Sequence, residues 1–82
     1  MEISVQMSVY ALDGREGEAV RRFLDALAER GVEVETGAMS STARGEEAFL
    51  WKALGEAWSE TAAEHPLVMT LTVSNACPVS GA

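Results

Sequence analysis

The feature that most constrains this chain is the order in which two kinds of hydrophobic periodicity follow one another. Apolar residues alternate with polar ones in residues 2–11, 32–35 and 67–74, a pattern typical of strands with one buried face, and residues 39–44 are expected to form a further strand, the third in chain order. Between the first and second of these segments, and again between the third and fourth, apolar residues recur at the spacing of an amphipathic helix. The sequence therefore predicts the order βαββαβ with short connections.

The first helical segment has recognisable signals at both ends. Asp13 is the expected N-cap, with Glu16 three residues later at the capping-box spacing. Gly31 is the expected residue just past the C-terminus, where glycine readily adopts a positive φ. The apolar face between these signals carries Val20, Phe23, Leu24 and Leu27.

The second helical segment begins near Glu46 and Glu47, because negative side chains are favourable at a helix N-terminus. His65 and Pro66 end it. We expect its apolar face to consist of Phe49, Leu50, Ala53, Leu54, Ala57, Trp58 and Thr61.

Right-handed crossovers place both helices on the same face of one sheet. We therefore predict an α+β fold, a ferredoxin-like split βαββαβ sandwich in which a four-stranded antiparallel sheet carries two helices on one face. In this fold the first and third strands are central. Residues 1–82 are expected to form a single ligand-binding domain, with residues 75–82 as a terminal tail.

Charge and composition exclude several classes of function. The chain has 13 acidic and 6 basic residues and a net charge of −7, a negative field that repels nucleic acids and anionic membranes. It has neither an apolar run of about 18 residues nor a signal-peptide pattern, so we expect a soluble cytoplasmic protein. One cysteine, Cys77, provides too few ligands for a structural zinc site, and we expect no metal.

The sheet face turned away from the helices is expected to carry neutral polar side chains, where a solvated face usually carries Lys, Glu or Arg. These side chains are Gln6, Ser8, Tyr10, Ser40, Thr42, Thr70, Thr72 and Ser74. Their donors and acceptors suit contact with a flat polar heterocycle, and they equally suit packing against a second subunit. Both interpretations remain open at this point, because a site at a subunit interface would use the same face for each. Small domains bury a limited fraction of their surface, which also favours a homo-oligomer.

Three aromatic residues could stack on a ligand. Tyr10, at the end of a central strand on the open face, is the best candidate for ring or cation–π contact. Trp58 shares the helical face of Leu54 and is expected in the core, whereas Trp51 lies at the edge of that face and is expected to be partly exposed.

Catalytic chemistry has little support in this sequence. His65 is expected to complement the C-terminus of the second helix, and no obvious base accompanies Cys77 as a nucleophile. An enzyme that uses Cys77 or His65 is therefore a minor alternative, and we expect a protein that is not an enzyme.

Three stretches, read together, resemble a known family. Residues 3–10 (ISVQMSVY), 37–46 (GAMSSTARGE) and 68–78 (VMTLTVSNACP) are similar, in this order and with helices between them, to the signature stretches of the YkoF-like thiamine/hydroxymethylpyrimidine-binding domains. The resemblance covers nearly the whole chain. It implies a single-repeat ferredoxin-like module that binds thiamine (vitamin B1) or its hydroxymethylpyrimidine moiety without transforming it and without a cofactor.

The resemblance also implies an assembly and a site. Because some members carry two modules in tandem, a homodimer or homotetramer would restore that arrangement. The pyrimidine ring is expected near the ends of the first and third strands, with Asn75 and the turn at Cys77 and Pro78 closing the pocket. The ligand-binding residues are expected to be Gln6, Ser8, Tyr10, Met39, Ser40, Thr42, Ser74, Asn75 and Cys77.

Thiamine carries a cationic thiazolium and an aminopyrimidine with donors and acceptors, which suits an acidic protein with a neutral polar face. With only Arg44 expected near that face, the unphosphorylated form is favoured over the diphosphate. The alternative function is a ligand-free interaction or regulatory module whose open face pairs subunits.

Overall fold

The order of elements is the one that the sequence predicts. The structure, a computed structural model, describes residues 1–37 and 40–76. Its elements are β1 (Glu2–Ala11), α1 (Glu16–Glu29), β2 (Val34–Thr36), β3 (Ser41–Glu46), α2 (Glu47–Ala62) and β4 (Leu67–Ser74).

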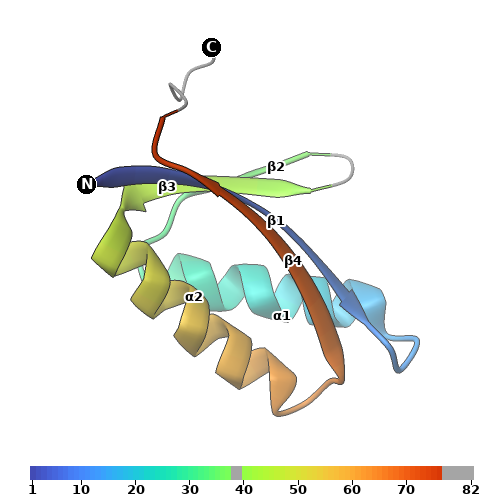
Figure 1. Ribbon diagram of the computed structural model, residues 1–82. Coiled ribbons are helices and arrows are strands. Elements are labelled where there is room, and N and C mark those ends of the chain that lie inside the picture. The colour runs from blue at the N-terminus through green and yellow to red at the C-terminus, as the bar shows by residue number, and fades with distance from the viewer. Residues whose placement is uncertain (38–39, 77–82) are drawn as a thin grey trace.

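The four strands form one antiparallel sheet in the order β2-β3-β1-β4. Both helices lie on the same side of this sheet, and within residues 1–37 and 40–76 no helix or strand covers its other side (Figure 1). This two-layer arrangement confirms the ferredoxin-like fold, and the crossovers place β1 and β3 at the centre as expected.

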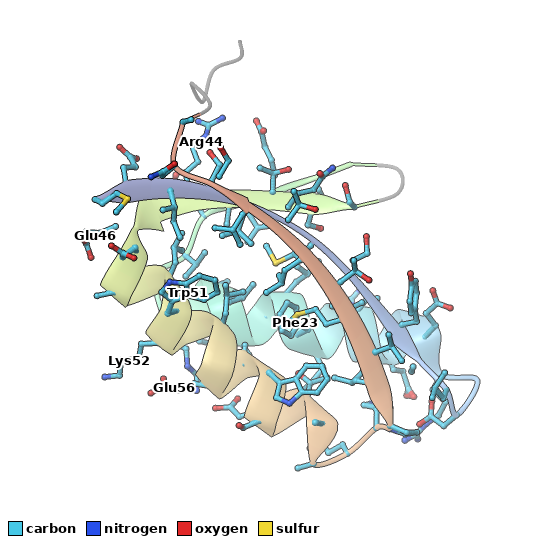
Figure 2. All side chains as sticks on the ribbon, in the orientation of Figure 1. Phe23, Arg44, Glu46, Trp51, Lys52 and Glu56 are labelled. Carbon is cyan, nitrogen blue, oxygen red and sulfur yellow. The ribbon has the colours of Figure 1, made fainter. Side chains whose placement is uncertain are left out.

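The hydrophobic core lies between the sheet and the helices. Along β1, Ile3, Val5 and Met7 are buried on the helix side, so the alternation in this strand was read correctly. Phe23 of α1 projects into the space between the two layers (Figure 2). The other buried core residues are Ala26, Leu27, Val32, Ala43, Leu50, Ala53, Leu54 and Ala57.

The N-terminus of α1 differs from the prediction in one respect. The N-cap position is Arg15, not Asp13. The Asp13 carboxylate instead accepts a hydrogen bond of 2.9 Å from the backbone N–H of Arg15, which forms a tight turn just before the helix. At the other end, Gly31 follows the C-cap with φ of +84°, as the sequence predicted.

The strand boundaries in the middle of the chain are also shifted. The third strand runs through Ser41–Glu46 rather than 39–44, because its pairing with β1 continues until Glu46 lies opposite Glu2. The prediction ended this strand at Gly45. This residue is still paired with β1, opposite Ile3, and the side chain of Leu50 packs over it. The second strand is Val34–Thr36 rather than 32–35.

In α2, one residue of the predicted apolar face lies outside the core. Leu50, Ala53, Leu54, Ala57 and Thr61 are buried, and Trp58 packs against the core from its margin. Phe49, however, is 46% exposed, and Trp51 is 45% exposed as expected. Glu46 is the N-cap and accepts a hydrogen bond of 2.9 Å from the backbone N–H of Ala48, in line with the predicted acidic start. No helix in the described part of the chain is long and apolar enough to cross a membrane.

Candidate ligand-binding face

The uncovered side of the sheet, here called the open face, is organised in rows that cross the strands. One row consists of Glu35, Thr42, Gln6 and Thr72, taken from β2 to β4. In another, Ser8 lies opposite Thr70. Because side chains opposite one another on neighbouring strands have Cβ atoms about 5 Å apart, each row presents a line of adjacent functional groups.

Neutral polar residues surround an open depression of about 380 Å³ at the middle of this face. Its lining comes from β1, from β4 and from the residue just before β3: Gln6, Ser8, Tyr10, Ser40, Thr70 and Thr72. The volume lies at the lower end of the range for small-molecule sites. We call this depression the neutral depression.

The side chains of the neutral depression already form one contact across the strands. The amide Nε2 of Gln6 donates a hydrogen bond of 3.0 Å to Oγ of Ser40. Tyr10 is 43% exposed at one end of the depression and lies opposite Val68 of β4. The lining thus offers hydroxyl and amide groups that both donate and accept, beside one aromatic ring, and no formal charge.

The structure brings together four of the nine predicted ligand-binding residues, namely Gln6, Ser8, Tyr10 and Ser40. It adds Thr70 and Thr72, which the alternation in the fourth strand placed on this face. Met39 and Cys77, with Pro78, lie outside the described residues.

Ser74 and Asn75 lie at the other end of the sheet from Tyr10. Ser74, the last residue of β4, is opposite Ser4, and Asn75 Nδ2 contacts the sulfur of Met1 at 3.4 Å. Tyr10 is instead opposite Val68, near the start of β4. Within one subunit, therefore, Asn75 does not close a pocket around Tyr10. The C-terminal half of β1 does lie beside the N-terminal end of β3, with Met7 opposite Ser41, and there Ser8 and Ser40 both line the neutral depression.

Thr42, the remaining predicted residue, lines a second depression of about 230 Å³ together with Glu33, Val34, Glu35 and Arg44. We call this the acidic depression, because its lining contains two carboxylates and one guanidinium. Arg44 projects on the side of the sheet away from the helices (Figure 2). The open face is therefore neutral around the middle of β1 and β4 but charged toward β2. Of these charged side chains, only Arg44 was expected near this face.

Glu33 and Glu35 were missed as site residues, although the sequence contained a signal for them. In the second strand, the apolar Val32 and Val34 alternate with these two carboxylates, which places both on the face opposite the core.

His65 does not have the role that the sequence predicted. Its side chain is only 5% exposed, and Nδ1 lies 3.0 Å from Oδ2 of Asp13, so that it connects the loop after β1 to the loop before β4. The hydrogen bond from the Arg15 backbone, and then that from His65, lower the pKa of Asp13. This pair lies at one end of the sheet and does not line the neutral depression.

A second ionic contact lies at the opposite end of the sheet. The N-terminal ammonium of Met1 is 2.9 Å from Oε2 of Glu46, and this contact lowers the pKa of the Glu46 carboxyl and raises that of the ammonium. Within residues 1–37 and 40–76, no group of three His, Cys, Asp or Glu side chains is placed to hold a metal ion.

The comparisons with known proteins identify the fold. The sequence matches no protein-family model and no curated protein. Among solved structures, a Thermotoga maritima protein with a proposed role in thiamine biosynthesis or salvage is similar over 100% of this chain and 89% of its own, with a TM-score of 0.81 and 20% identity. A Streptococcus pneumoniae protein is similar over 98% of this chain and 92% of its own, with a TM-score of 0.86 and 18% identity.

A Bacillus cereus domain of unknown function, DUF77, is similar over 100% of this chain and 82% of its own, with a TM-score of 0.76 and 21% identity. At these identities the likeness shows the fold alone. The chain therefore shares its ferredoxin-like fold with these proteins.

Proposed function

We propose that this protein binds thiamine, or its hydroxymethylpyrimidine moiety, on the open face of the sheet, as a non-catalytic member of the YkoF-like family. The observation that carries the proposal is the neutral depression, in which six uncharged polar side chains from β1, from β4 and from the residue just before β3 converge. The likeness of the fold to that of a protein with a proposed role in thiamine biosynthesis or salvage gives further support.

The chemistry of the neutral depression matches an aminopyrimidine. The ring nitrogens of the pyrimidine accept hydrogen bonds and its amino group donates them, while the hydroxyls of Ser8, Ser40 and Thr70 can do either. Tyr10 offers a ring face at the end of the row. Side chains on neighbouring strands can thus form hydrogen bonds with the donors and acceptors along the edge of one small planar ring.

The lining of the neutral depression supports binding without chemical transformation. Among its described lining residues there is no carboxylate, imidazole or thiol to act as general base or nucleophile. We expect thiamine to be recovered unchanged after prolonged incubation with the protein, which chromatography of the supernatant can verify.

Isothermal titration calorimetry with thiamine and with hydroxymethylpyrimidine tests binding directly. It is preferable to tryptophan fluorescence, because Trp51 and Trp58 lie on α2, on the other side of the sheet from the depression. Ser40→Ala and Gln6→Ala should each weaken binding by about 0.5–1.5 kcal/mol, or roughly two- to tenfold, because each removes one hydrogen-bonding group.

Ser59→Ala is the matched control, since it removes an exposed hydroxyl from α2 and should leave affinity unchanged. If the parent binds neither ligand, the proposed function is wrong. If it binds them but the Ser40 and Gln6 variants bind equally well, the site lies elsewhere.

A further inference from the structure

The helix side of the molecule contains a pocket that the proposed function does not use. Its volume is about 290 Å³, and it lies between the first half of α1 and the loop from α2 to β4. The lining residues at the start of α1 are Arg15, Glu18, Arg21, Arg22 and Asp25, and Glu64 and His65 line the other side. We call it the helix pocket. Three of the six basic residues of a chain with a net charge of −7 are gathered here.

One end of the helix pocket is held by contacts within the protein. Nε of Arg15 lies 3.4 Å from Oε1 of Glu18 and 3.5 Å from Oδ2 of Asp13. The same Asp13 oxygen lies 3.0 Å from Nδ1 of His65, whose buried ring is thereby held in the wall of the pocket. The charged groups further along α1 are not engaged in this way.

Unpaired groups are concentrated in that second part of the lining. Among the residues that the structure describes, the side chains of Arg21 and Asp25 form no ion pair or hydrogen bond. Nε of Arg22 is buried without a hydrogen-bond partner, and its terminal nitrogen lies 3.6 Å from Glu64 and 3.9 Å from Glu60, too far for hydrogen bonds. Buried donors are normally paired, so an unpaired one in the lining of a pocket points to a ligand.

The order of charges along α1 indicates which kind of ligand fits. Side chains three and four positions apart are neighbours on a helix, so residues 18, 21, 22 and 25 form one patch. In this patch the guanidiniums of Arg21 and Arg22 stand between the carboxylates of Glu18 and Asp25. A simple anion would lie close to the carboxylates, and a simple cation would lie close to the guanidiniums. A ligand with one charge of each sign avoids both repulsions.

We propose that the helix pocket binds the carboxylate and ammonium groups of a small free α-amino acid. The carboxylate accepts hydrogen bonds from Arg21 and Arg22, because guanidinium groups are suited to carboxylates, and the ammonium donates to Asp25. The ligand is neutral overall, so the negative field of the protein does not repel it. The pocket volume is just below the range for drug-sized ligands, which fits a smaller molecule. This site goes beyond the proposed function and is separate from the open face.

Proton NMR spectroscopy can test this site, because His65 is the only histidine of the chain and lines the pocket. L-Alanine is the probe. Propionate, which lacks its ammonium, and ethylamine, which lacks its carboxylate, are matched control ligands. At pH 7 and low salt, alanine should shift the ring signals of His65 saturably. It should bind about two- to fivefold more tightly than either control ligand, because each of these loses one of two exposed charge contacts.

Variants of the parent locate the site. Arg21→Gln and Asp25→Asn should each weaken alanine binding about two- to fivefold. Lys52→Gln and Glu29→Gln remove the same charges at exposed positions outside the pocket and should leave alanine binding unchanged. All four positions are exposed, so each variant should keep the melting temperature of the parent.

Propionate that binds as tightly as alanine would overturn the proposal, because the carboxylates of the pocket would then play no part. The absence of a saturable shift with alanine would also overturn it, as would equal binding by the parent and the Arg21 and Asp25 variants. Equal losses in all four variants would show an effect of net charge alone and would count against it too. None of these outcomes affects the open face, which is tested separately with thiamine.

Discussion

Val5 and Gln6 are neighbours in β1, yet Val5 is completely buried beneath the helices, whereas Gln6 stands exposed on the open face. The same contrast holds for Met7, in the core, and Ser8, in the lining of the neutral depression. One face of the sheet thus contributes the packing that stabilises the fold, and the other contributes groups that can bind. Burial of the apolar side chains fixes the position and register of the strand. The polar side chains on the opposite face are therefore held in place without having to stabilise the fold themselves.

The largest expected effect is on the free energy of unfolding, and it should differ between substitutions on the two faces of the sheet. Met7→Ala should lower the free energy of unfolding by about 2–5 kcal/mol, because it leaves a cavity in the core. Gln6→Ala, one residue away, should lower it by less than about 1 kcal/mol, because an exposed side chain is removed. Urea denaturation measures both values. Similar losses for the two variants would show that the faces are not energetically distinct.

The next effect concerns the assembly of subunits through the open face. Val68 is 40% exposed beside Tyr10, and we expect this face to meet a second copy of the chain in a homodimer or homotetramer. Val68→Lys should then give monomers in sedimentation velocity at micromolar concentration, because an unpaired charge is costly to bury. Ser59→Lys, on the exposed side of α2, should leave the assembly unchanged. A parent protein that sediments as a monomer would refute the expected assembly.

The smallest effect concerns one end of the sheet, where Asp13 in the loop after β1 contacts His65 in the loop before β4. Because the folded state lowers the pKa of Asp13, its ionised form stabilises the fold at neutral pH. That contribution is present above the ordinary aspartate pKa of about 3.9 and is lost as the pH falls through the lower value of the folded state. Asp13→Asn should therefore destabilise the protein at pH 7, and its difference from the parent should shrink as the pH falls through the pKa of the folded state.

Thermal unfolding between pH 2 and pH 7 measures this decrease. Asp25→Asn removes an exposed carboxylate from α1 and should show no comparable dependence on pH. A constant difference between Asp13→Asn and the parent over the whole range would mean that the ionised carboxylate does not account for the stabilisation.

Local patterns in the sequence were enough to predict the elements and the faces of the strands. The alternation in residues 2–11 placed Gln6, Ser8 and Tyr10 on the open face, and the capping residues marked the ends of the helices to within a few positions. Such patterns depend on residues that lie two to four positions apart, so they can be read without knowing what the element packs against. For the same reason the prediction failed where packing decides, as at the exposed Phe49.

Only the tertiary structure decided which residues become neighbours across the sheet. The antiparallel register separates Asn75 from Tyr10, brings Glu35 beside Thr42, and closes the loops that place Asp13 against His65, 52 residues away. No local pattern contains this information, because register is set by the joint burial of one face of each strand and by hydrogen bonds between distant segments. The sequence by itself determined which side chains of the first strand face away from the helices, and the pairing of the strands determined which side chains of different strands can contact one ligand.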